Sequence, residues 1–234
     1  MTITSPVRER ILESATQLFA TASLRSVSAD KVITGAGTTK VTFYRHFPTK
    51  DDLVVAYLDA QLALLRAAVE NQQAVIEEKL AVVEEERATA EKKRAAADDN
   101  QSFMEEPRST PRVAAACAVL EWLAEANGVA ACRSGFRGCV FINAAAEYPA
   151  EGNSVRAAVE RYRSWLHDVV SGLLADLGTR APGTVADQLI MLRDGAMVHG
   201  FMDDPTSVTA SLVTAGRAII NANLPAPRAE HQAV

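Results

Sequence analysis

Residues 28–50 read SADKVITGAGTTKVTFYRHFPTK, and their spacing predicts two short helices joined by a glycine-containing turn. Ser28 is a suitable N-cap for the first helix, in which apolar residues recur three and four positions apart. Gly37 then leaves this helix, because a residue without a Cβ adopts a positive φ at little cost. The second helix begins at Thr38 or Thr39. Two helices joined in this way form a helix-turn-helix, whose second helix enters the DNA major groove.

The second helix carries side chains that suit contacts with DNA. Lys40 and Arg45 are able to neutralise phosphates or to donate to guanine. Thr42 is small enough to let the backbone approach DNA, and Tyr44 leaves a hydroxyl at the edge of a buried ring. At the start of the following helix, Lys50 is a further candidate for phosphate binding, because a helix N-terminus attracts anions.

The pattern T-x-x-T-F-Y-R-H-F-P-T-K-D-D-L, which ends at Leu53, resembles the hallmark of the tetracycline-repressor-type (TetR) family of transcription regulators. The resemblance begins at about Arg8. It implies an all-α fold, with an N-terminal three-helix DNA-binding module that contains the helix-turn-helix, and a C-terminal helical ligand-binding and dimerisation domain. Together with the side-chain chemistry it predicts a set of DNA-binding residues: Ser28, Thr39, Lys40, Val41, Thr42, Tyr44, Arg45, His46 and Lys50. One departure is Gly35, where the family usually carries alanine or a longer residue; glycine inside a helix costs about 0.5–1 kcal/mol relative to alanine.

A plainer interpretation stands beside this one. The apolar residues of both helices, among them Val32, Ile33 and Phe47, are also expected core residues of a small helical bundle. They would pack on a first helix from Pro6 to Ala22. His46 is as readily a structural residue as one that contacts DNA.

The distribution of charge favours a DNA-binding N-terminal part. The 234 residues are 48% apolar and 6% aromatic, and their net charge of −5 argues against a non-specific nucleic-acid binder. Residues 1–50 nevertheless hold seven Lys or Arg and three Asp or Glu, whereas residues 51–234 carry a net charge of −9. We expect a helix-turn-helix DNA-binding domain at 1–52, a helical effector-binding and dimerisation domain at 53–224, and a flexible tail at 225–234.

Neither a membrane segment nor a metal site is expected. No apolar run approaches the roughly 18–20 residues that span a membrane, and the N-terminus lacks the order of a signal peptide, which predicts a cytoplasmic location. The cysteines Cys117, Cys132 and Cys139 fit neither a secreted disulfide framework nor a metal site. No cofactor is predicted. A redox pair of Cys132 and Cys139 is the less favoured alternative to plain burial.

A single long helix is predicted from Thr49 to about residue 97. Thr49 would be its N-cap, and Asp52 would complete a capping box. A helix of roughly 47 residues is about 70 Å long at 1.5 Å per residue. Its charged part, about residues 70–97, has a thin apolar seam, as in a coiled-coil arm, and the alternative is a solvated extension.

Residues 135–149 contain G-C-x-x-x-N-A-A-A-E, which is similar to a subgroup of TetR-type C-terminal domains. Aromatic residues here and in neighbouring helices are predicted to line a cavity, while Asn143 and Glu147 share one helical face and present polar groups to a ligand. The predicted effector pocket consists of Trp122, Phe136, Phe141, Asn143, Glu147, Tyr148, Trp165 and Met191. The alternative is core packing for the apolar residues, with Asn143 as a cap and Glu147 as a solvated charge.

Two long helices are predicted at 154–177 and 184–202, each apolar on more than one side. Their own domain covers one side, and the resemblance implies that a second copy covers the other in a four-helix bundle. The predicted dimer interface consists of Val159, Tyr162, Leu166, Val169, Leu173, Leu189, Leu192, Ala196 and His199. His199 is interpreted as a packed interface residue rather than a metal ligand.

The predicted function is that of a homodimeric transcription regulator, most simply a repressor, which binds a near-palindromic operator and is released by a small, mostly apolar effector. An enzyme is not expected, because the four histidines show no catalytic spacing: His46, His167, His199 and His231. The alternative is a protein-interaction scaffold that uses the charged helical arm and has no DNA target.

Overall fold

A computed structural model describes residues 5–96, 117–118, 120–127, 137–202 and 208–224. These residues form α-helices and no strand, which confirms the all-α prediction. The helices are α1 (Pro6–Thr21), α2 (Ala29–Gly35), α3 (Lys40–His46), α4 (Lys50–Ala96), α6 (Val140–Glu147), α7 (Ser154–Asp176), α8 (Pro182–Met202) and α9 (Val208–Asn223). Residues 120–127 are also helical, and the predicted tail at 225–234 lies outside the described residues.

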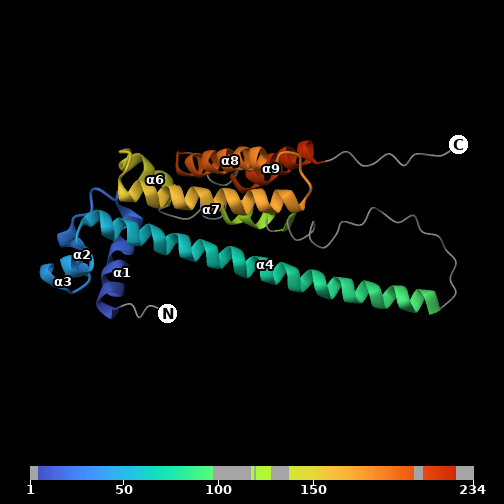
Figure 1. Ribbon diagram of the computed structural model, residues 1–234, viewed down its shortest axis with the longest axis horizontal. Coiled ribbons are helices and arrows are strands. Elements are labelled where there is room, and N and C mark those ends of the chain that lie inside the picture. Colours follow the sequence, from blue (N-terminus) through green and yellow to red (C-terminus); the bar gives the residue numbers. More distant parts are fainter. Residues whose placement is uncertain (1–4, 97–116, 119, 128–136, 203–207, 225–234) are drawn as a thin grey trace.

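Helices α1, α2 and α3 form a small module at one end of the molecule (Figure 1). Helix α1 packs against both α2 and α3. Val32, Ile33 and Phe47 are buried in the same core as Ile11 and Phe19 of α1, as the sequence predicts. The local pattern of apolar residues was therefore sufficient to identify the core of this module.

The two helices of the predicted motif begin at the caps that the sequence indicates. The Ser28 hydroxyl accepts a hydrogen bond from the Lys31 N–H at 3.3 Å. The Thr39 hydroxyl accepts one from the Thr42 N–H at 3.2 Å. Between the helices Gly37 has a φ of +58°, the left-handed conformation that glycine adopts without steric cost. The observed motif is a helix-turn-helix.

Gly35 is explained by the close approach of α1 to α2. The Ser14 side chain of α1 is buried, and its hydroxyl donates to the Val32 carbonyl oxygen at 3.1 Å. A Cβ added to Gly35 would lie 2.4 Å from the Ser14 Oγ, closer than van der Waals contact allows. The glycine therefore leaves room for a hydroxyl that joins the two helices.

Replacing Gly35 by alanine should lower the free energy of unfolding by about 1–3 kcal/mol, although alanine is the better helix former. In a Ser14→Ala background the same change should cost clearly less, because the nearest atom is then the residue 14 Cβ at 3.5 Å. Urea unfolding of the four proteins of this double-mutant cycle, followed by circular dichroism, measures the difference. An equal cost in both backgrounds would contradict the packing explanation.

Helix α4 connects the N-terminal module to the rest of the protein. It begins with the predicted capping box: the Thr49 N–H donates to the Asp52 carboxylate at 2.9 Å, and the Asp52 N–H donates to the Thr49 hydroxyl at 3.1 Å. Its 47 residues confirm the predicted length. The N-terminal part packs on α1 and α7, and the C-terminal part projects past the other helices (Figure 1). A coiled-coil role for that projecting part stays a prediction.

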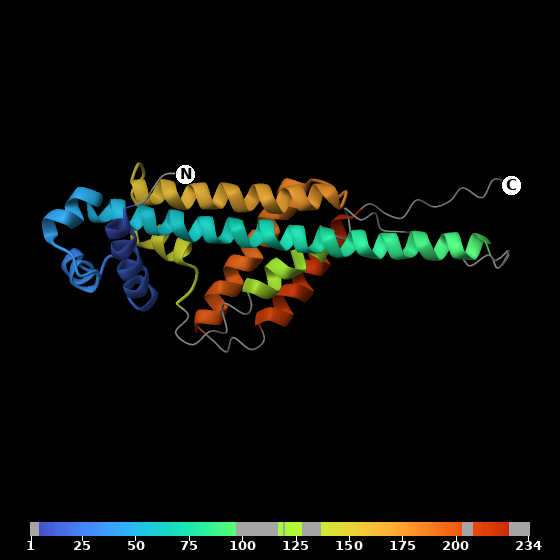
Figure 2. The same ribbon diagram turned by 90° about the horizontal axis from the view of Figure 1, so that it is seen from below.

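The larger body is organised around α7. Helix α7 contacts α4, α6 and α8, and α9 packs along α8 (Figures 1 and 2). Residues 120–127 lie beside α9 (Figure 2), and Arg217 of α9 forms an ion pair with Glu121 of this segment. In the described part of the chain, no helix combines the length and apolarity needed to cross a membrane.

The apolar faces of α7 and α8 pack largely against other helices of the same chain. The predicted interface is therefore wrong for four residues that are buried in the single chain: Val159, Tyr162, Leu166 and Leu173. The physical reason is that hydrophobic periodicity identifies a face that avoids water but not the surface that covers it. Leu189 and Leu192 are half-buried and line a cavity, and their place at an interface stays a prediction. Val169, Ala196 and His199 are half-buried or exposed, and their place at an interface stays a prediction.

Helix α8 presents a different apolar set to solvent. Met191 is 64% exposed, Val198 46% and Met202 72%, and their spacing of seven and four residues places them on one face. Phe201 beside them is also exposed. Gly195 lies on the same face, where an added Cβ would meet nothing within 4 Å. We call Met191, Val198, Phe201 and Met202 the outer face of α8; exposed apolar groups of this size mark an interaction site.

Candidate functional site

The outward side of α3 carries four of the residues predicted to bind DNA. Phe43 is fully buried and fixes which side of this short helix faces the core. On the other side Val41 is 79% exposed and Tyr44 is 41% exposed. Lys40 and Arg45 are exposed as well. Two cations, a hydroxyl and an apolar group are therefore exposed together on one surface. Such side chains bind phosphates and contact base edges in the major groove.

Two helix caps and Thr42 supply three more hydroxyls in the helix-turn-helix. Thr39 is exposed, and its hydroxyl donates to the half-buried Thr42 hydroxyl at 2.9 Å. Ser28 is exposed at the start of α2. Because the Ser28 and Thr39 oxygens cap the starts of α2 and α3, any phosphate bound there would also meet the positive end of a helix.

Lys50 and His46 are more enclosed than the sequence suggests. The Lys50 ammonium donates to the Arg25 carbonyl oxygen at 2.8 Å, which leaves two of its three N–H groups for a phosphate. Burial lowers the pKa of Lys50, and the Glu147 carboxylate opposes this shift. His46 is half-buried. For all nine predicted residues, contact with DNA stays a prediction.

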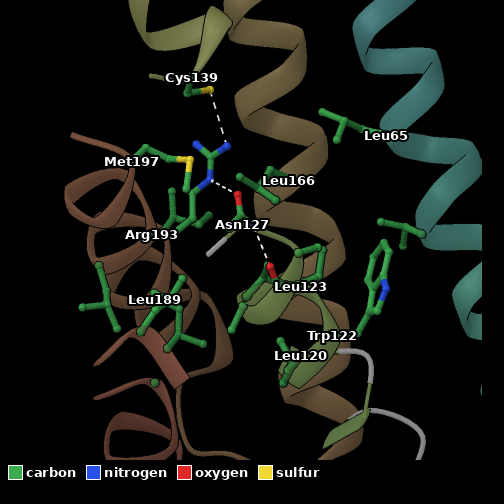
Figure 3. Close-up of a pocket in the computed structure, with 18 of the residues that line it drawn as sticks. Leu65, Leu120, Trp122, Leu123, Asn127, Cys139, Leu166, Leu189, Arg193 and Met197 are labelled. Carbon is green, nitrogen blue, oxygen red and sulfur yellow. Dashed lines mark hydrogen bonds between the residues drawn. The ribbon is translucent and has the colours of Figure 1, made fainter. Parts of the chain in front are cut away.

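A cavity of about 670 Å³ lies inside the body, between α4, α7, α8, α9 and residues 117–127 (Figure 3). Its volume falls in the range of about 300–1,000 Å³ that is typical of small-molecule sites. The wall is mostly apolar, and it includes three of the predicted pocket residues, Trp122, Phe141 and Trp165.

Four predicted pocket residues do not line this cavity. Met191 belongs to the outer face of α8. Tyr148 is buried, and the Arg25 guanidinium lies over its ring, 4.9 Å from the ring centroid. The Asn143 amide donates to the Arg137 carbonyl oxygen at 2.8 Å and so fixes the turn before α6. Glu147 binds backbone groups near the N-terminal module, as described below. Their assignment to the pocket is wrong, because residues four apart on α6 need not face the cavity. Phe136 lies outside the described residues.

Sequence reasoning missed the polar groups of the cavity, above all Arg193. Its guanidinium donates from Nε to the Asn127 Oδ1 at 3.0 Å and from Nη2 to the Cys139 Sγ at 3.4 Å (Figure 3). It also donates from Nη1 to the Asp194 Oδ1 at 2.8 Å. Burial lowers the pKa of Arg193, but the neighbouring Cys139, Tyr162 and Asp194 outweigh it, so the net shift is upward. No periodicity in the sequence predicts these hydrogen bonds, because their partners come from three separate segments.

Two tyrosines lie close to the same polar group. Tyr162 stacks on Phe141 with ring centroids 3.8 Å apart, and the Arg193 guanidinium lies 5.9 Å from the Tyr162 ring. Burial raises the pKa of Tyr162 and of Tyr57, and the neighbouring Cys139 sulfur adds to both shifts. Both hydroxyls therefore stay protonated at neutral pH and act as donors. Cys139 is a buried free thiol, whereas Cys132, its suggested redox partner, lies outside the described residues.

Glu147 joins the body to the N-terminal module. Its carboxylate accepts hydrogen bonds from the Leu24 N–H at 3.1 Å and the Arg25 N–H at 2.7 Å, in the loop between α1 and α2. The other end of α6 reaches the cavity at Cys139 and Phe141. Helix α6 thus has one end at the cavity and the other at the module that carries α3.

Two further hydrogen bonds support this junction. The Arg137 guanidinium donates to the Thr21 carbonyl oxygen at 2.6 Å, and the Asn153 amide donates to the Asp51 carboxylate at 3.1 Å. Both donors flank α6 in sequence, and both acceptors belong to helices of the N-terminal part or its connection. A displacement of α6 would therefore strain several hydrogen bonds to the N-terminal module at once.

Comparisons with known proteins agree with this arrangement. The family model for bacterial regulatory proteins of the tetR family matches residues 11–57. A TetR-family transcriptional regulator from Streptomyces coelicolor is 30% identical, with 94% of this chain and 96% of that chain covered and a TM-score of 0.70. The reduced form of NemR from Escherichia coli is 14% identical, with 92% and 98% covered and a TM-score of 0.67. A TetR-family regulator from Agrobacterium tumefaciens is 15% identical, with 94% and 98% covered and a TM-score of 0.63. No curated protein matches the sequence.

Proposed function

This chain belongs to the TetR family of bacterial regulatory proteins, and from that premise we propose that it is a ligand-released, homodimeric repressor of transcription. Members of this family are DNA-binding regulators rather than enzymes. The observation that carries the proposal is the exposed, positively charged side of α3, held on a module whose core is complete. Such a regulator works where the DNA is, so a cytoplasmic location is part of the proposal.

The DNA contact divides into positioning and reading. Lys40 pairs with Asp30 at 3.9 Å with both side chains largely exposed, and a surface pair of this kind is weak enough for a phosphate to replace. Tyr44 and the hydroxyls of Ser28 and Thr39 suit phosphate contacts, while the exposed Val41 suits contact with a thymine methyl group. Two copies of α3 related by a two-fold axis would enter major grooves about 34–36 Å apart.

The outer face of α8 is the proposed dimer contact. Met191, Val198 and Met202 expose apolar side chains in the single chain, and Gly195 between them lets another helix approach closely. An isologous contact would place this face against its own copy across the two-fold axis. The proposal keeps α8 in the interface but replaces the side of the helix that the sequence suggested.

Release by an effector follows from the position of α6. A ligand that fits the cavity better when α6 is displaced would also loosen the Glu147 contacts to Leu24 and Arg25. The N-terminal modules of the dimer would then lose the spacing that an operator requires. Operator affinity would fall by the ratio of the ligand's affinities for the two states.

The repressor proposal predicts a selective loss of DNA binding in Lys40→Ala. Duplexes enriched from a random-sequence library by the purified protein serve as the operator. Lys40→Ala should weaken binding about 5- to 30-fold and reduce the slope of log K against log salt by about one, because one phosphate contact is lost. Electrophoretic mobility shifts at several salt concentrations measure both quantities.

The matched control is Lys79→Ala, which removes one exposed lysine from α4, far along the helix from α3. It should leave affinity and slope unchanged. If the wild-type protein enriches no duplex at low salt, the repressor proposal fails, and the projecting part of α4 becomes the starting point for a protein-interaction role.

A further inference from the structure

We propose that the effector is a monocarboxylate with an apolar body, and that its carboxylate binds the Arg193 guanidinium and the Tyr57 and Tyr162 hydroxyls. This inference rests on the proposed function, because it names the chemical class of the ligand for the same cavity. It follows from three properties of the cavity: an excess of donors at one site, a net charge of +1 there, and an apolar wall elsewhere.

The polar site offers donors that lack acceptors. Tyr57 is 6% exposed and Tyr162 is 2% exposed, both line the cavity, and neither hydroxyl has a hydrogen-bond partner in the described part of the chain. No buried side-chain oxygen in the described part of the chain lacks a hydrogen-bond partner, so these two hydroxyls open onto the cavity, where water or a ligand accepts from them. Arg193 uses three of its five N–H groups on described residues, and one of these acceptors is the Cys139 sulfur, a weak acceptor that a carboxylate oxygen would readily displace.

The charged side chains of the cavity wall carry a net charge of +1. Asp194 lies outside this wall and pairs with both Arg193 and the partly exposed Arg163, so its one negative charge is shared between two guanidinium groups. The other charged residues of the cavity wall, Glu121 and Arg217, pair with each other at 2.8 Å and cancel. A monoanion therefore neutralises the site. A cation would be repelled, a neutral ligand would leave the charge in place, and a doubly charged phosphate would leave an uncompensated negative charge in an apolar cavity.

The remainder of the cavity determines the body of the ligand. Leucine, valine and tryptophan side chains surround the space away from Arg193, including Leu120, Trp122 and Leu65 (Figure 3). Apolar contact there contributes binding energy without specificity, and the carboxylate sets the orientation. A fatty or aryl-alkyl carboxylic acid combines both features, and its head would lie beside Cys139, the residue that precedes α6.

The test is isothermal titration calorimetry of the full chain at pH 7.5 with decanoate, 4-phenylbutanoate and 2-naphthoate. Decan-1-ol and decylamine serve as probes with the same body and a different head group. At least one acid should bind, and decanoate should bind at least about tenfold more tightly than either the alcohol or the amine, since only a carboxylate accepts charge-assisted hydrogen bonds.

Variants locate the carboxylate. Arg193→Gln should raise the Kd of the acids at least about tenfold, and a Tyr57→Phe/Tyr162→Phe double variant should raise it about 5- to 30-fold. The control Arg156→Gln removes the same charge from a partly exposed position of α7 outside the cavity wall and should change the Kd less than about threefold. If Arg193→Gln does not fold, as circular dichroism would reveal, the tyrosine variant and the head-group series decide the question.

The inference is overturned if no acid binds, if the alcohol or the amine binds as tightly as the acid, or if the acids keep their affinity in both the arginine and the tyrosine variants. Operator binding by the same proteins without ligand separates this failure from that of the proposed function. Selective DNA binding without any preference for carboxylates would refute the ligand class alone. Carboxylate binding without DNA binding would refute the repressor and leave the ligand site in place.

Discussion

Replacing Val198 by aspartate is expected to convert the protein to a monomer and to lower its operator affinity more than about 100-fold. Val198 lies near the middle of the outer face of α8, between Met191 and Met202. In a two-fold contact the change places two aspartates in one apolar interface, and each unpaired buried charge costs several kcal/mol. A cost of about 1.4 kcal/mol weakens the dimer about tenfold, so even part of this cost of burying the aspartates dissociates the dimer. Each monomer then binds only one half-site of the operator.

Light scattering coupled to size-exclusion chromatography measures the change in mass, and mobility shifts measure the operator affinity. Val198 is already 46% exposed in the single chain, so the aspartate should leave the helix content of the monomer intact. Asn71→Asp is the matched control, because it adds one negative charge to an exposed position on α4. A Val198→Asp protein that remains a dimer would place the subunit contact elsewhere.

Replacing Glu147 by glutamine should abolish most of the response to an effector. The carboxylate accepts from two adjacent backbone N–H groups, whereas a carboxamide offers one acceptor oxygen and turns a donor toward the other N–H. Hydrogen bonds to a charged group contribute about 1.5–3 kcal/mol each, and allosteric coupling between two sites is typically about 1–3 kcal/mol. Loss of this contact is therefore comparable to the whole coupling energy. A compound that releases the wild-type protein from DNA should release the variant only weakly.

Hydrogen exchange followed by NMR tests the structural cause without any effector. The Leu24 and Arg25 amides should exchange at least about tenfold faster in Glu147→Gln, while amides in the core of α7 keep their rates. Glu151→Gln, which neutralises an exposed glutamate four residues later, is the control and should change neither rate. Unchanged exchange at Leu24 and Arg25 would show that Glu147 does not hold this loop in solution.

Some features of the site could be predicted from the sequence and others could not. Trp122, Phe141 and Trp165 were placed at the cavity because large aromatic residues of a helical body usually face its interior. Arg193 was missed, since a charged residue inside a helix is ordinarily assigned to the surface. Glu147 was assigned to the wrong partner for a related reason: the N–H groups that donate to it lie more than 120 residues away in the sequence, and no local pattern records that distance.

The sequence by itself determined the helix-turn-helix, its caps at Ser28 and Thr39, the glycine turn and the length of α4. Each of these depends on hydrogen bonds or apolar contacts between residues at most four or five positions apart, which a linear pattern contains. Only the tertiary structure decided which side of α8 faces solvent, where the Arg193 charge is buried and which backbone groups the Glu147 carboxylate binds. Those outcomes depend on which helices pack together, and a helix with two apolar sides is compatible with either orientation until its neighbours cover one of them.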